Sequence, residues 1–191
     1  MSYGTNLIVN PSAETQDTSN WTVDGVTVEE NTTVATTYSH IINDADGWLG
    51  QYDHKIALVG AAGDYCFVFA SDADASMYQI LYASDIGATP DSFQFIISFK
   101  LANYQNAWDP SVLGKAILKI DYDDGLFDYF TIPLVKGLYH VDRNLTNFWI
   151  KTVLVCAMDN TKTIEQITVS IETDNFTQGL YVDYIELRKE V

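Results

Sequence analysis

Residues 116–130 read AILKIDYDDGLFDYF, and this stretch decides the fold class. Alternate side chains of a β-strand point to opposite faces of a sheet. The even-numbered residues of 116–122 are apolar or aromatic, whereas Lys119 and Asp121 face the other way and only Ile117 breaks the alternation. Asp124-Gly125 then supplies the residues of a tight turn. The stretch therefore predicts a half-buried strand that leads into a β-hairpin.

Short runs of β-branched and aromatic residues recur along the whole chain, with turn residues between them and almost no helical periodicity. Ten or so short strands at this spacing are typical of a sandwich or barrel. We expect one all-β domain over residues 1–191, a jelly-roll β-sandwich of about ten or more antiparallel strands. The expected strands are 6–9, 21–29, 34–42, 55–59, 65–70, 76–82, 92–101, 114–122, 129–133, 147–157, 165–172 and 180–189.

The composition limits the classes of partner. The chain has 191 residues with 47% hydrophobic residues, enough for one full core. Its 26 acidic and 10 basic residues give a formal net charge of -16. Such a surface repels phosphate backbones and anionic lipids, so we expect no nucleic-acid partner and no membrane partner. A negative surface suits cations and neutral partners such as sugars.

Two further features concern the cellular context. Cys66 and Cys156 lie inside apolar runs, which favours two buried thiols, with a disulfide between them as the alternative. The residues before Asn6 lack the basic region and apolar core of a signal peptide. We therefore expect synthesis in the cytoplasm, with the virion or the extracellular space after lysis as the final location.

The last expected strand contains a carboxylate among apolar neighbours. In Tyr181–Leu187 the alternation places Asp183 on the same side as Ile185 and Leu187. A buried carboxylate needs a cation or strong hydrogen-bond donors, because burying it alone costs several kcal/mol or shifts its protonation. Asp183 is therefore expected to have either a cation or strong hydrogen-bond donors beside it.

Four stretches, in this order, resemble jelly-roll carbohydrate-binding modules of the galactose-binding-like superfamily. They are Asn6–Glu14 followed by Trp21, His54–Gly60, Tyr78–Tyr82 followed by Phe93–Lys100, and Gly179–Leu187. The second is similar to the "G-K-x-S-L-x-V" strand of these modules, with His54 where Gly is usual. The third is similar to their "Q-x-V" and "Y-x-L-S-F-x-x-K" strands. The fourth is similar to their closing strand, "V-x-x-D-D-V-x-L".

This resemblance implies that the first and last strands are neighbours and that a structural calcium ion ties them. The ligands that it implies are the carboxylates of Glu14, Asp53 and Asp183, with the carbonyl groups of Ser12 and Lys55 as helpers. Calcium takes about six to eight hard oxygen ligands in a flexible geometry, and such residues supply them. The alternative is that Glu14 is solvated and Asp183 accepts main-chain hydrogen bonds.

The sequence offers no recognisable catalytic group. Its three histidines, His40, His54 and His140, are not spaced as zinc ligands. There is no G-x-S-x-G motif and no glycine-rich phosphate loop. Glycosidases use a pair of carboxylates across a cleft, but 26 acidic residues guarantee such pairs by chance. We therefore expect a protein that is not an enzyme.

Aromatic residues make up 13% of the chain and indicate a binding surface. Sugar rings stack on exposed aromatic rings, while amides and carboxylates fix their hydroxyl groups. The loops 46–52 and 103–110 and the strand 78–82, where Tyr78 and Tyr82 share a face, have this chemistry. The strand residues Trp21 and Trp149 are assigned to the core. The candidate ligand contacts are Trp48, Tyr52, Tyr78, Gln79, Tyr104, Asn106 and Trp108.

Two main hypotheses of function remain open, and a glycoside-acting enzyme is a third, minor one. The first is a non-catalytic module that resembles carbohydrate-binding modules and recognises a glycan or polysaccharide through loop aromatics. The second is a virion structural protein, a phage head-decoration or tail subunit, whose partners are further copies of itself or capsid and tail proteins. Trp48 and Trp108 suit a ligand platform and a protein–protein contact equally well.

Overall fold

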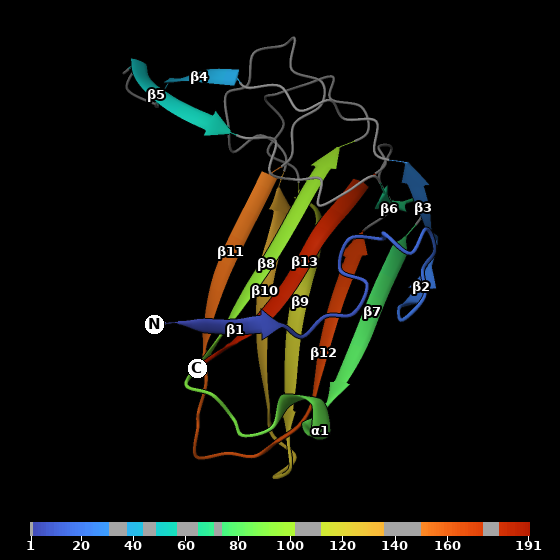
Figure 1. The fold of residues 1–191 in the computed structure, drawn as a ribbon, viewed down its shortest axis with the longest axis vertical. Helices are drawn as coiled ribbons and strands as arrows, with labels where there is room; N and C mark the ends of the chain where they lie inside the picture. The colour runs from blue at the N-terminus through green and yellow to red at the C-terminus, as the bar shows by residue number, and fades with distance from the viewer. Residues whose placement is uncertain are drawn as a thin grey trace.

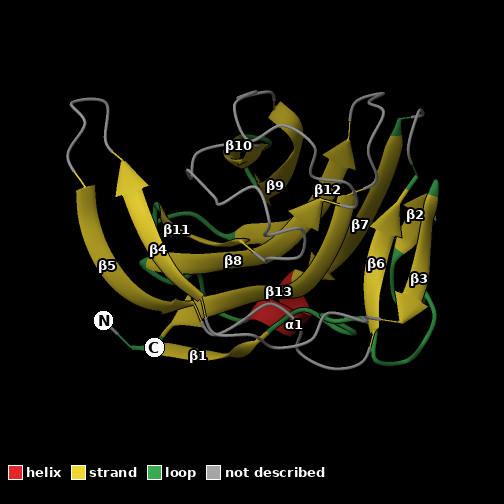
Figure 2. Ribbon diagram, turned by 90° about the horizontal axis from the view of Figure 1, so that it is seen from above, coloured by secondary structure: helices red, strands yellow, loops and turns green. Residues whose placement is uncertain are grey.

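The structure, a computed structural model, describes residues 2–30, 38–43, 49–56, 65–70, 74–101, 112–135, 150–173 and 180–191. Within these ranges the side chains of 30, 38–43, 49–56, 100–101, 112–113, 135 and 150 are not described. Thirteen strands and one short helix occupy the described residues. Most strands form two antiparallel sheets packed face to face, which confirms the predicted all-β sandwich (Figure 1, Figure 2).

The first sheet, called sheet A here, has six strands. Its order is β11-β8-β13-β6-β3, and β1 pairs with β13 outside this path. Every pairing is antiparallel. The strands are β1 (Tyr3–Asn6), β3 (Val26–Glu30), β6 (Tyr65–Phe69), β8 (Ser92–Leu101), β11 (Ile150–Ala157) and β13 (Leu180–Glu190).

The second sheet, sheet B, has five strands in the order β10-β9-β12-β7-β2. These are β2 (Thr22–Asp24), β7 (Ala75–Tyr82), β9 (Val112–Tyr122), β10 (Phe127–Val135) and β12 (Ile164–Thr173). A separate two-stranded sheet pairs β4 (Tyr38–Asn43) with β5 (Leu49–Ile56). The helix described, α1 (Ala83–Ile86), has only four residues, so nothing helical in the described ranges is long enough to cross a membrane.

The core lies between the two sheets and follows the alternation in the sequence. The even-numbered residues of 116–122 are all buried in it, as predicted. Trp21 also belongs to the core, where its ring meets Phe67 edge-on with centroids 5.8 Å apart. Gly125, with φ +80°, turns the chain between β9 and β10, which are paired as the Asp-Gly signal predicts.

The first and last strands are neighbours, as predicted, and both chain ends lie at the same side of the sandwich (Figure 1). Asn6 fixes this contact because its side chain bonds to β13 twice. Its amide Nδ2 donates to the carbonyl of Ile185 over 3.0 Å, and its Oδ1 accepts from the amide of Leu187 over 2.9 Å. Oδ1 also accepts from the amide of Ile8 over 3.1 Å, which turns the chain away from the sheet. The strand therefore ends at Asn6, whereas the prediction placed it at 6–9.

Two other predicted segments differ from the structure. The run 21–29 was predicted as one strand, but Gly25 adopts φ +66° and divides it. Its first part, β2, joins sheet B, and its second part, β3, joins sheet A. The prediction of a loop over 46–52 is wrong for its described part, because Leu49 to Tyr52 lie in β5.

The face on which Asp183 lies was also predicted wrongly. The register of β13 against β8 shifts between Asp183 and Glu186, and Tyr184 has φ 54°. This bulge places Val182, rather than Asp183, on the core side together with Ile185. Asp183 points to the outer side of sheet A, yet it is fully buried there.

Both cysteines are buried thiols, which agrees with the favoured interpretation. Cys66 lies on β6 and Cys156 on β11, with β13 and β8 between them. Three strand spacings separate the two positions by about 14 Å, too far for a disulfide. Burial raises the pKa of the Cys156 thiol to about 12, so this group stays protonated at neutral pH.

Candidate functional site

The outer face of sheet B, called the sheet-B face, forms a regular grid of side chains. It is built by the residues of four neighbouring strands whose parity points them away from the core. From β10 to β7 its rows are Phe127–Asp121–Gln166–Tyr82, Tyr129–Lys119–Thr168–Ile80, Thr131–Ile117–Ser170–Tyr78 and Pro133–Lys115–Glu172–Ser76.

Aromatic rings flank this grid on both sides. Tyr78 and Tyr82 on β7 are 39% and 58% exposed, and Phe127 and Tyr129 on β10 are 60% and 51% exposed. Among the described side chains, these four are all of the exposed aromatic ones. Strand spacings place the two flanks about 14 Å apart. Burying exposed rings is favourable only when a partner covers them, so their concentration on one face indicates a contact surface.

Between the flanks the floor is polar, and its charges are paired. Lys119 Nζ lies 2.6 Å from Asp121 Oδ1, and Gln166 Nε2 donates to Asp121 Oδ2 over 3.1 Å. The hydrogen bond from Lys119 lowers the pKa of Asp121 below its usual value of 3.8. In the last row, Lys115 and Glu172 form a second ion pair at 3.4 Å. These partners hold the polar atoms of the floor in fixed positions.

An open hollow of about 250 Å³ lies at the end of the floor, next to the β9–β10 hairpin. It is lined by Lys119, Asp121, Tyr122, Gly125, Leu126, Glu165 and Gln166. Lys119 Nζ lies 5.4 Å from the ring centroid of Phe127, so the cation also orients the ring at the flank. The hollow is mainly polar and belongs to the same surface as the first row.

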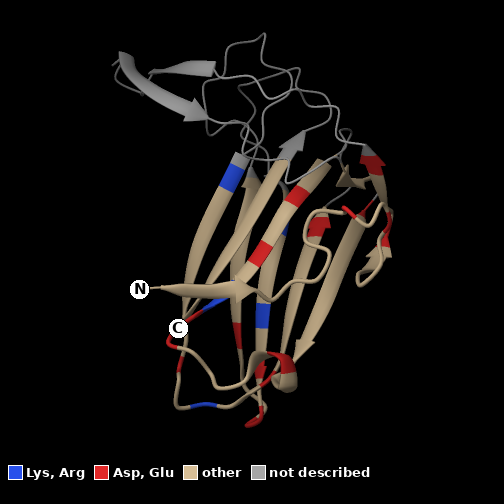
Figure 3. Ribbon diagram, in the orientation of Figure 1, with Lys and Arg blue, Asp and Glu red and all other residues tan. Residues whose placement is uncertain are grey.

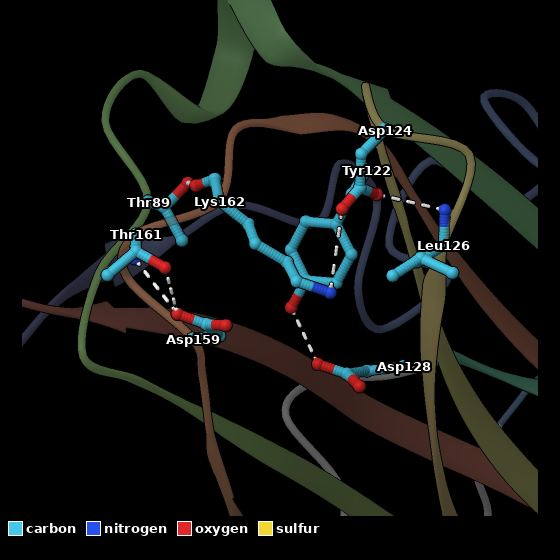
Figure 4. A network of polar contacts seen from close by, with 8 residues as sticks. All are labelled: Thr89, Tyr122, Asp124, Leu126, Asp128, Asp159, Thr161 and Lys162. Carbon is cyan, nitrogen blue, oxygen red and sulfur yellow. Dashed lines mark hydrogen bonds and ion pairs between the residues drawn. The ribbon is translucent and has the colours of Figure 1, made fainter.

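A network beneath the hairpin holds the border of this hollow in place (Figure 4). The Tyr122 hydroxyl donates to Asp128 over 2.6 Å, and burial together with this carboxylate raises the pKa of Tyr122. Lys162 Nζ lies 4.7 Å from the Tyr122 ring centroid and 3.7 Å from Asp124. Asp124 in turn accepts from the amide of Leu126 over 2.9 Å. These contacts tie the two strands of the hairpin, β9 and β10, to each other and link the turn to Lys162, just before β12.

The predicted ligand contacts fall into three groups. Tyr78 lies on the sheet-B face. Gln79 points inward and is only 7% exposed, because its amide bonds to the main chain of Val9 and Asn20. Gln79 thus organises the N-terminal loop. The others cannot be placed: Tyr52 lies in β5 without a described side chain, and Trp48, Tyr104, Asn106 and Trp108 lie outside the described residues.

Phe127 and Tyr129 were missed by the sequence analysis. The predicted strand began at 129, which left Phe127 outside it, and the alternation does not show which of its side chains are exposed. The signal was the pairing implied by the hairpin: Phe127 lies opposite Asp121 and Tyr129 opposite Lys119. Since opposite residues of a pair share a face, the parity of Lys119 and Asp121 already fixes that of the two rings.

The predicted calcium ligands lie partly in the described region. Glu14 Oε1 accepts from the amide of Tyr65 on β6 over 3.2 Å, and the amide of Ile185 on β13 donates to the carbonyl of Pro11 over 2.9 Å. The turn 11–14 therefore bridges two strands next to Asp183, whose Oδ1 accepts from the amide of Tyr184 over 2.6 Å. Within the described ranges no three His, Cys, Asp or Glu side chains group as metal ligands. The residues Asp53 and Lys55 lie in β5, where side chains are not described.

Comparisons with known proteins yield structural matches alone: no protein-family model and no curated protein matches the chain. The family 61 carbohydrate-binding module TmCBM61, solved with β-1,4-galactotriose, is 15% identical with a TM-score of 0.53. That match covers 98% of this chain and all of the module. A family 16 carbohydrate-binding module is 16% identical with a TM-score of 0.53, and the match covers 95% of this chain and 99% of the module.

Two further matches extend the range of proteins with this fold. The CBM22-1 xylan-binding domain of Paenibacillus barcinonensis Xyn10C is 12% identical with a TM-score of 0.51, covering 99% of this chain and 97% of the domain. The enzymatically active domain of bacteriophage CBA120 tailspike protein 4 is 16% identical with a TM-score of 0.54. There the match covers 95% of this chain but 21% of the tailspike chain. The chain therefore has the jelly-roll fold found in carbohydrate-binding modules, as the sequence motifs predicted.

Proposed function

We propose that the protein is a non-catalytic glycan-binding protein and that the sheet-B face contacts the sugar. The observation that carries this proposal is the gathering of every exposed described aromatic side chain on that one face, around a polar floor. The fold supports it, because its structural neighbours include modules solved with a galactotriose or described as xylan-binding. Because such folds host many functions, the fold alone does not identify a ligand, and the main support for a sugar comes from the surface.

The grid suggests how a sugar chain is held. Aromatic rings at the flanks stack on the apolar C–H faces of sugar rings, while the floor offers donors and acceptors to hydroxyl groups. The first row supplies both kinds of group, with Phe127 and Tyr82 at its ends and Asp121 and Gln166 between them. Since these polar groups already hold each other, they lose little conformational entropy on binding.

The charges favour an uncharged glycan. Lys115 and Lys119 are the cations of the floor, and each is paired with a carboxylate. Glu165 beside the hollow and Asp24 on β2 add negative charge that is not balanced within the floor. The carboxylates of a uronic-acid polymer would be repelled by these side chains and by the net charge of -16. Neutral polysaccharides are therefore the expected ligands.

Affinity electrophoresis with neutral polysaccharides tests this function. We expect retardation by at least one β-linked galactan, xylan or glucan, and no retardation by polygalacturonate. Tyr82→Ala and Phe127→Ala should each weaken binding about tenfold, which corresponds to about 1.4 kcal/mol. Val9→Ala removes an apolar side chain of similar exposure (53%) away from the face and serves as the control. Unchanged mobility in a broad panel of neutral glycans would refute the function.

The predicted aromatics of the loops remain part of the proposal. The aromatic residues Trp48, Tyr104 and Trp108, with the amide of Asn106, would extend the contact beyond the sheet. Trp108→Ala distinguishes the two surfaces: it should weaken binding of long polysaccharides if the loops take part. If Trp108→Ala abolishes binding and Tyr82→Ala has no effect, the loops alone form the site.

We also propose that a calcium ion stabilises the contact between the N-terminal turn and β13. Glu14, Asp183 and, from β5, Asp53 would hold it, with carbonyl groups of Ser12 and Lys55. One atom supports the fit: Ser98 Oγ, opposite Asp183 on β8, is fully buried and has no hydrogen-bond partner among the described residues. The Ser98 hydroxyl and the Asp183 carboxylate are hard oxygen donors, the type of ligand that calcium prefers. The ion would act structurally.

Chelation tests the calcium proposal. A ligand at about 100 times its dissociation constant stabilises the folded state by about 2.7 kcal/mol, so removing it should lower the melting temperature by roughly 5 to 10 °C. Asp183→Asn should remove the difference between calcium and EDTA, whereas Asp17→Asn, at an exposed carboxylate, should retain it. Equal melting temperatures of the wild-type protein in calcium and in EDTA would refute the proposal.

A virion structural protein is the second candidate function. The observation that favours it is the likeness in fold to part of a phage tailspike, at a TM-score of 0.54. This function predicts a closed, symmetric oligomer that forms without any glycan. Light scattering of the purified chain separates the candidates: a stable ring or trimer supports assembly, whereas a chain that remains monomeric excludes it.

A further inference from the structure

Apart from the four-residue β1, which pairs only with β13, the two main sheets have four outer strands, and three of these carry features that discourage pairing with another chain. An outer strand presents unpaired main-chain N–H and C=O groups, which proteins shield with short length, charges or proline. β2 has only three residues, and β3 ends in Glu29 and Glu30. β10 contains Pro133, which lacks an N–H group. These three edges are therefore poor templates for a further strand.

β11 is the exception. It has eight residues without proline, pairs with β8 on one side, and has no described strand on its other side. Val153 and Val155 point outward and are 49% and 51% exposed, next to exposed Lys151 and Ala157. Figure 3 shows β11 with one basic band and no acidic residue. In a chain of net charge -16, this is a place where two copies can approach with little repulsion.

We propose that β11 pairs with β11 of a second copy of the chain, antiparallel and about a two-fold axis at Leu154. This register sets Val153 opposite Val155 of the second copy, so four half-exposed valines cover one another. Lys151 lies opposite Ala157 of the second copy and diagonal to its Asp159, which gives an attraction between opposite charges. The two copies of sheet A then form one continuous sheet.

The sequence of the strand favours a copy of itself over a foreign peptide. The register keeps residues 151–157 of both strands paired and places no like charges opposite each other. Shifting it by two residues would set Lys151 opposite Val155 and leave one opposed pair of valines, Val153 with Val153, in place of two. Main-chain hydrogen bonds supply the affinity of such strand addition, and the side chains on alternate positions supply the specificity.

Sedimentation velocity of the full chain over a range of concentrations tests the proposal. The wild-type protein should shift from monomer to dimer, and added salt should raise the dimer fraction because it screens the negative charge. Val153→Lys and Val155→Lys should each weaken dimerisation at least tenfold, since like charges would then lie diagonal to each other across the axis. Val9→Lys, at an equally exposed valine (53%) on the N-terminal loop, should leave it unchanged.

Three results would overturn the proposal. The first is a wild-type protein that remains monomeric up to about 1 mM, because a dimer with a higher dissociation constant has a negligible interface. The second is a dimer that survives both lysine variants, since its interface would lie elsewhere. The third is a series of open aggregates or pairing with an added extended peptide in place of a closed dimer. Melting temperatures within a few degrees of wild type show that the variants remain folded.

Discussion

The outer faces of the two sheets follow the same alternation but present different chemistry. On sheet A, polar side chains are buried: Asp183 and Ser98 are fully covered, and Glu186 is 3% exposed with two bonds to Arg188. On sheet B, large aromatic rings are exposed around paired charges. Burying polar groups costs free energy unless partners satisfy them, so the sheet-A face is organised to hold the chain ends. Exposed aromatic rings contribute no free energy of burial until a partner covers them, so the sheet-B face is suited to contact with a partner.

Removing the Asn6 contact should have the largest effect on the sheet-A face. Asn6→Ala leaves the Ile185 carbonyl and the Leu187 amide without their side-chain partner and should lower the free energy of unfolding by about 2 to 4 kcal/mol. Urea denaturation measures this change. Thr5→Ala, at an exposed side chain of the same strand, is the control. Equal stabilities of the two variants would mean that Asn6 does not hold the termini.

Removing the rings of Tyr82 and Phe127 together should have the next largest effect, which should fall on the affinity for the glycan and not on stability. Tyr82 and Phe127 stand at opposite ends of one row, about 14 Å apart, so their contributions should add. Tyr82→Ala with Phe127→Ala should reduce the affinity roughly a hundredfold while the melting temperature changes little. Isothermal titration calorimetry with the preferred polysaccharide measures this. A double variant that loses no more affinity than either single variant would show that the rings do not bind one ligand across the row.

Acidification should have a small effect on the sheet-B face until the pH approaches 4. The pKa of folded Asp121 is below its ordinary value of 3.8, so its contribution to stability is present above that value and is lost as the pH falls through the folded pKa. Binding should therefore be constant between about pH 5 and pH 8. Lys119→Ala removes the main cause of the shift and should raise the pKa of Asp121. Carboxyl NMR titration tests this: an Asp121 that titrates at the same pH in both proteins would contradict the ion pair.

The sequence predicted what local alternation controls. The parity of 116–122, the Asp-Gly hairpin and the strand β8 are all found. The adjacency of the first and last strands, which the family resemblance implied, is found as well. It failed where one residue changes the direction of the chain. Gly25 divides a run into two sheets, and the bulge at Tyr184 moves Asp183 from the core side to the outer side. These changes depend on tertiary hydrogen bonds that no local pattern records.

The proposed binding face was predictable only in part. Tyr78 and its strand were identified, but amide chemistry alone made Gln79 a candidate, and its burial follows from contacts with residues far away in the sequence. Phe127 and Tyr129 become significant only when strand order places them across two strands from β7. Exposure is a property of the assembled sheets, so a list of aromatic residues cannot show which of them face solvent.

Mapping amide chemical shifts during titration with a bound neutral glycan tests the central claim most directly. The sheet-B face predicts changes in the outward residues of β7, β12, β9 and β10, largest around Tyr82, Gln166 and Asp121, and no changes along β8, β11 and β13. Changes confined to sheet A, or to residues remote from the four rows, would contradict it.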